Sequence, residues 1–110
     1  MIENTLAKIE EKIQTVTSIP DEHKGELLNL LSTLKEEIQT LSETESERAE
    51  SITGFTQVLT HEATRQEKNQ RLLQLSLDGL ASSVQGFETS HPRLVESVNA
   101  ICQTLANIGI

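Results

Sequence analysis

The chain has 110 residues, with 17 acidic and 9 basic side chains and a net charge of −8. This acidic balance argues against binding to nucleic acid or to an anionic membrane surface, both of which require a basic face. The length allows one domain, 1–110, and the 2 prolines and 5 glycines are too few for the frequent turns of a β-sandwich or barrel.

The first two predicted helices cover about residues 2–17 and 19–42. Their aliphatic residues recur at steps of four and three, which places them on one helical face, as in a coiled-coil heptad. They are Ile2, Leu6, Ile9, Ile13 and Val16 in the first helix and Leu27, Leu31, Leu34, Ile38 and Leu41 in the second. The short corner between the helices, Ser18-Ile19-Pro20-Asp21, predicts an antiparallel hairpin.

Residues 45–88 form the third predicted segment, and two questions about its path stay open. The acidic Ser/Thr cluster of residues 42–50 favours a break near 42–46, although the heptad register would also let the second helix continue. The segment itself is either one long helix or is broken near residues 61–71, where there is almost no apolar face.

The two alternatives for this segment differ in what they imply about assembly. At ~1.5 Å per residue a continuous helix would be about 65 Å long and would overhang its shorter neighbours. A partner chain would then be needed to cover it. A turn near residues 61–71 would instead allow four or five short helices to close as a monomer.

The last predicted helix covers about residues 92–108, starts after Ser90-His91-Pro92 and reaches a C-cap at Gly109. From Pro92 onward its only charged residues are Arg93 and Glu96. A helix so poor in charge is expected to be buried on more than one side, so we predict that it lies at the centre of an assembly. The expected core or self-association residues are Leu94, Val98, Ile101, Leu105 and Ile108, with Leu73, Leu80 and Phe87 preceding them.

No pattern of reactive residues predicts an enzyme. The stretch His61-Glu62-Ala63-Thr64-Arg65 begins like the zinc motif H-E-x-x-H, but Arg65 replaces the second histidine. The acidic run Glu43–Glu50 lacks the glycine turn of a calcium loop. Cys102 is the only cysteine, which excludes an intramolecular disulfide, and it lies in an apolar helix. We therefore expect no catalytic residues, no metal and no cofactor.

The sequence also predicts where in the cell the protein is located. Its N-terminus lacks the basic segment and apolar run of a signal peptide, and no stretch approaches the roughly 18 apolar residues of a membrane span. We therefore expect a cytoplasmic protein.

The end of the chain resembles a known family. The residues that carry the resemblance are Phe87-Glu88, His91-Pro92-x-Leu94 and Leu105-Ala106-Asn107-Ile108-Gly109-Ile110. They resemble an uncharacterised family of short bacterial helical proteins, catalogued only as a domain of unknown function. Residues 45–72 look like an insertion relative to its shorter members. The resemblance implies an all-α fold and implies no known activity. From the heptad-spaced helices themselves we expect bundle-like or coiled-coil-like packing.

Two functions fit these expectations. The first is a non-catalytic helical interaction or structural protein that self-associates through coiled-coil-like seams, with a dimer favoured. The alternative is an adaptor or small chaperone-like module that binds a partner's amphipathic helix. This alternative predicts an exposed apolar strip at Leu72–Leu80 or on the Ile52–Leu59 face.

Overall fold

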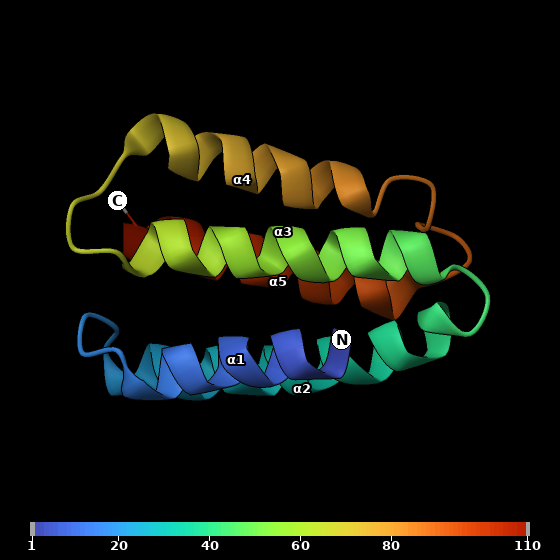
Figure 1. Ribbon diagram of the computed structural model, residues 1–110, viewed down its shortest axis with the longest axis horizontal. Coiled ribbons are helices and arrows are strands. Elements are labelled where there is room, and N and C mark those ends of the chain that lie inside the picture. The colour runs from blue at the N-terminus through green and yellow to red at the C-terminus, as the bar shows by residue number, and fades with distance from the viewer. Residues whose placement is uncertain (1, 110) are drawn as a thin grey trace.

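The computed structural model describes residues 2–109, which form five helices and no strand (Figure 1). The helices are α1 (Ile2–Thr15), α2 (Asp21–Ser42), α3 (Ser46–Thr64), α4 (Gln70–Ser83) and α5 (Pro92–Gly109). Each helix runs antiparallel to the one before it. The predicted all-α fold, with its N-terminal helical hairpin, is confirmed.

The helices are arranged in three layers (Figure 1). The hairpin of α1 and α2 forms one outer layer, α3 and α5 form the middle layer, and α4 lies outside them on the opposite side. Within the described chain, α4 contacts α3 and α5 but neither helix of the N-terminal hairpin. The fold is therefore a four-helix bundle of α1, α2, α3 and α5 with a fifth helix added to one side.

Residues 45–88, which the sequence predicts as either one long helix or a broken one, contain two helices. The break falls at residues 65–69 and is stabilised by polar side chains. Lys68 donates hydrogen bonds to the backbone carbonyls of Ala63 (2.6 Å) and Arg65 (3.0 Å), and Asn69 caps α4 by accepting from the amide of Leu72 (3.0 Å). A long overhanging helix is absent from the described chain, so the argument for a partner that rested on it no longer applies.

The helix that we expected to extend to residue 88 ends at Ser83. Gly86 follows with a φ of +94°, a left-handed conformation that glycine adopts without steric cost. Phe87 is then held in the core by Arg48, whose guanidinium lies 3.8 Å above the ring, and by the edge-on ring of His91. The turn between α4 and α5 is thus anchored by an aromatic side chain.

The last helix, α5, contacts α2, α3 and α4, so it is buried on more than one side. A C-cap was predicted at Gly109, but α5 includes Gly109 as its last residue, and Gly86 is the only described glycine with a positive φ. A Cβ added to Gly109 would lie 2.8 Å from Cδ2 of Leu73, so this glycine allows α4 and α5 to approach closely. Neither α5 nor any other described helix is long and apolar enough to cross a membrane.

The central helix is α3, which contacts all four other helices. It is less apolar than α5, and four of the side chains that it buries are threonines. Each threonine hydroxyl donates to the carbonyl four residues earlier, at 2.7–2.8 Å, so none of them is left unsatisfied. These residues are Thr53, Thr56, Thr60 and Thr64. A helix that contains several polar residues can therefore occupy the centre, because its buried threonines are small and their hydroxyls donate to carbonyls of the same helix.

The threonine hydroxyls should contribute little to stability, because each bonds only within its own helix. Thr56 is fully buried, so Thr56→Val should change the free energy of unfolding by less than about 1 kcal/mol. Thr56→Ser keeps the hydroxyl but removes a packed methyl group and should cost about 1 kcal/mol. Urea unfolding followed by circular dichroism would measure both. A serine variant more stable than the valine variant would contradict this account.

Ile101 is 1% exposed in α5, so Ile101→Asp should place an unpaired carboxylate in the core. We expect a loss of at least about 3 kcal/mol in the free energy of unfolding, or no folded protein. Gln103→Asp, on the exposed face of the same helix, is the control and should cost less than about 0.5 kcal/mol. Equal urea midpoints for the two variants would show that α5 is not part of the core.

Candidate functional site

The eight residues named from the sequence as core or self-association residues lie along the inner faces of α4 and α5 and in the turn between them. Seven of them are buried, and Ile108 is partly buried against the core. The seven are Leu73, Leu80, Phe87, Leu94, Val98, Ile101 and Leu105. Because helices of the same chain cover these side chains, a surface that binds another protein has to be sought elsewhere.

The large apolar side chains that remain exposed gather on one face of the α3–α4 hairpin. Phe55 and Val58 of α3 are 40% and 49% exposed, and Leu72 and Leu75 of α4 are 41% and 55% exposed. All four line one shallow pocket of about 150 Å³, together with Glu62 and Ser76. We refer to these four apolar residues as the α3–α4 groove.

The groove combines parts of the two strips that the adaptor alternative predicted. Leu72 and Leu75 come from the first strip, and Phe55 and Val58 come from the second. The remaining aliphatic residues of both strips are buried or partly buried in the core: Ile52, Leu59, Leu73, Leu77 and Leu80. Only the folding of residues 65–69 into a turn brings the four exposed residues onto one surface.

Gly79 sets how closely Phe55 of the groove approaches α4. A Cβ built at this position would overlap the ring of Phe55, so the absence of a side chain lets that ring lie directly against α4. Glycine inside a helix costs about 1 kcal/mol relative to alanine. Gly79 therefore lowers the stability of α4, but it allows the ring of Phe55, which is still 40% exposed, to pack against this helix.

The polar groups beside the groove already have partners. The carboxylate of Glu62 is largely buried and accepts a hydrogen bond from Nη1 of Arg65 at 3.0 Å. The hydroxyl of Ser76 donates to the backbone carbonyls of Leu72 and Leu73. The groove therefore offers mainly apolar contact, with a paired charge at one edge.

Cys102, the only cysteine of the chain, does not line the groove. Burial raises the pKa of the Cys102 thiol to about 11, so the thiol stays protonated at neutral pH and is a poor nucleophile. In the H-E-x-x-R stretch, Arg65 forms an ion pair with Glu62. No set of three or more His, Cys, Asp or Glu side chains within residues 2–109 is arranged to hold a metal ion.

Comparison with known proteins gives a family and no activity. No curated protein and no solved structure matches the chain. The family described as "Domain of unknown function (DUF4404)" matches residues 2–110, a range that includes the segment 45–72 as well as the C-terminal motif. The resemblance seen at the end of the sequence is thereby confirmed, and the chain belongs to this family of unknown function.

Proposed function

We propose that this protein is a non-catalytic helical interaction protein of the cytoplasm, which self-associates as a dimer through the α3–α4 groove. The observation that carries the proposal is the clustering of Phe55, Val58, Leu72 and Leu75, the four large apolar side chains that remain exposed among residues 2–109. Contiguous exposed apolar surface is characteristic of interaction sites.

The size of the groove sets the expected affinity. Each of its four side chains is about half exposed, so covering it gives roughly 1 kcal/mol. Two copies would double this contribution, but association also costs several kcal/mol in lost translational and rotational freedom. We therefore expect a weak, reversible dimer with a dissociation constant on the order of tens of micromolar or weaker.

Charge around the groove favours a second copy of the chain as the occupant. The net charge of −8 opposes self-association in general, but at the groove Glu62 is paired with Arg65, and the exposed face of α4 carries Arg71 as well as Asp78. Two copies can therefore meet on this face without bringing their excess negative charge together.

The exposed face of α4 is also complementary to itself. Arg71 and Asp78 lie about two helical turns apart on either side of Leu75, and all three are exposed. If two α4 helices packed antiparallel about a two-fold axis, Arg71 of each copy would lie opposite Asp78 of the other. A symmetric dimer requires such a self-complementary surface.

The first test removes the apolar contact. Leu75→Glu would place a charge in the groove and should abolish the dimer, because a carboxylate buried at an interface loses its hydration. The control Ala81→Glu adds the same charge to an exposed position of α4 outside the groove. Sedimentation equilibrium over a concentration series gives the dissociation constants, and thermal unfolding checks that both variants fold.

The proposal would be wrong if the wild-type chain stayed monomeric up to millimolar concentration, or if Leu75→Glu dimerised as tightly as Ala81→Glu. A wild-type monomer whose groove resonances shift on addition of an amphipathic helical peptide would instead support the adaptor alternative.

The second test addresses the symmetry of the dimer. Arg71→Glu should weaken self-association, because it places two carboxylates opposite each other at both ends of the interface. Adding Asp78→Arg should restore the affinity to within about threefold of wild type, since the opposite charges are paired again. Sedimentation equilibrium of the two single variants and the double variant completes a double-mutant cycle. Additive effects without restoration would contradict the antiparallel pairing of α4.

A further inference from the structure

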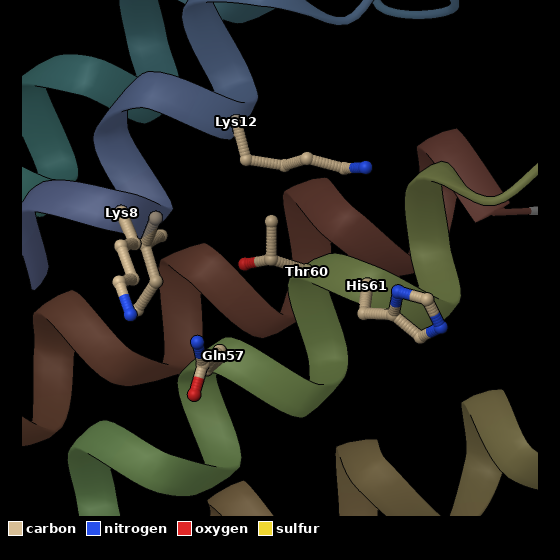
Figure 2. A pocket seen from close by; sticks show the side chains of 6 residues that line it. Lys8, Lys12, Gln57, Thr60 and His61 are labelled. Carbon is tan, nitrogen blue, oxygen red and sulfur yellow. The ribbon is translucent and has the colours of Figure 1, made fainter. Parts of the chain in front are cut away.

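A second pocket lies on a different face of α3, between α3 and α1. It encloses about 240 Å³ and is lined by Lys8, Ile9, Lys12, Gln57, Thr60 and His61. Figure 2 shows the side chains of Lys8 and Lys12, from α1, and of Gln57 and His61, from α3, around this space. We call it the α1–α3 pocket.

The polar side chains that line the pocket are mostly hydrogen-bond donors. The two lysine ammonium groups can only donate, and the amide of Gln57 and the ring of His61 each carry an N–H group. No aspartate or glutamate lines the pocket. Thr60 differs, because its hydroxyl already donates to the carbonyl of Thr56 at 2.8 Å. The pocket is therefore electropositive in a protein whose net charge is −8.

The two lysines lie one helical turn apart on α1, and neither forms an ion pair with a carboxylate of the described residues. They lie four residues apart on α1, a spacing at which like charges repel and destabilise a helix. Within the described chain, no ion pair of 4.0 Å or less involves either of them. The chain has 17 acidic side chains for 9 basic ones, so carboxylates are plentiful elsewhere on the protein. A bound anion would remove this repulsion.

Of the pocket's donors, His61 takes part in an ion pair among residues 2–109. Its Nε2 atom lies 4.0 Å from Oε2 of Glu62, but Oε1 of Glu62 is bound by Arg65 at 3.0 Å. Glu62 also lines the α3–α4 groove and not the α1–α3 pocket. The negative charge of Glu62 is therefore largely matched by Arg65.

We propose that the α1–α3 pocket binds a small multivalent oxyanion, namely a phosphate group, with Lys8 and Lys12 as the charged ligands. Gln57 and His61 would donate further hydrogen bonds to its oxygens. In Figure 2 the ammonium groups of Lys8 and Lys12 extend in different directions. Lysine carries a point charge on a flexible four-carbon stem, so both side chains can turn toward one phosphate.

The surroundings of the pocket restrict the ligand to a small molecule. The volume of about 240 Å³ lies below the roughly 300–1,000 Å³ of pockets for drug-sized ligands. A nucleic acid backbone would extend past the pocket over a surface that carries the chain's net negative charge, which disfavours a polymer of phosphates. The ligand is therefore free phosphate or the phosphate group of a small metabolite.

The experiment is a titration of the full-length protein with inorganic phosphate, followed by amide NMR shifts. Chloride holds the ionic strength constant, so that general screening does not change. The wild-type chain should show saturable shifts at Gln57 and His61. A parallel titration with glucose 6-phosphate separates the two sources, because a tighter affinity for the monoester indicates a metabolite and an equal affinity indicates free phosphate.

Two double variants make the result specific to the pocket. Lys8→Gln/Lys12→Gln removes both charged ligands and should weaken binding by about tenfold or more. Lys35→Gln/Arg93→Gln removes the same amount of charge from α2 and α5, which do not line the pocket, and should change the affinity by less than about twofold. Phosphate should also raise the thermal midpoint of the wild-type chain and of the control, but not that of the lysine variant.

The proposal would be overturned if the shifts rose linearly without saturation. It would also be overturned if both double variants lost affinity equally, because the protein would then respond only to overall charge. Since self-association is measured separately by sedimentation, failure of phosphate binding leaves the proposed dimer untouched.

Discussion

The contact of α3 with all four other helices is the constraint on which the rest of the structure depends. A helix in this position must contact the N-terminal hairpin, α5 and α4 at once, so its inward side chains have to be small or apolar. Its buried threonines meet this requirement because their hydroxyls are satisfied by the helix's own carbonyls. Larger polar residues at these positions would need partners that the neighbouring helices do not provide.

The position of α3 also explains why both candidate surfaces include it. A helix at the centre contributes one edge to every groove between itself and its neighbours. Toward α4 it presents Phe55 and Val58, and toward α1 it presents Gln57 and His61. An apolar surface and an electropositive pocket are thus placed on different faces of one helix. A partner on the α3–α4 groove would leave the α1–α3 pocket open.

The helices with clear amphipathic patterns were predictable from the sequence, whereas for the central helix the sequence predicted a helical segment from about residue 45 but left open where it ends. In α1, α2 and α5 the aliphatic residues recur at steps of four and three, because one side of each helix faces the core and the other faces solvent. In α3 this contrast is weak, because the helix contacts its neighbours on several sides and several of its buried residues are threonines rather than aliphatic residues. The stretch at residues 61–71, which has almost no apolar face, contains Lys68 and Asn69. These two residues stabilise a turn by capping the end of α3 and the start of α4.

The candidate surfaces were harder to predict than the helices, because they depend on which helices become neighbours. Leu73 was predicted to be a core residue and is 3% exposed, whereas Leu75, two residues later in the same helix, is 55% exposed. Their difference comes from the position of α4 outside the bundle, where it buries one side and leaves the other free.

The pocket between α1 and α3 likewise depends on which helices become neighbours. Lys8 and Lys12 have the spacing of ordinary surface residues in the sequence, and only the packing of α1 beside α3 places them next to Gln57 and His61. A helical sequence therefore predicts its core more readily than its surfaces, because the core follows from each helix's own periodicity whereas the surfaces follow from the packing of several helices together.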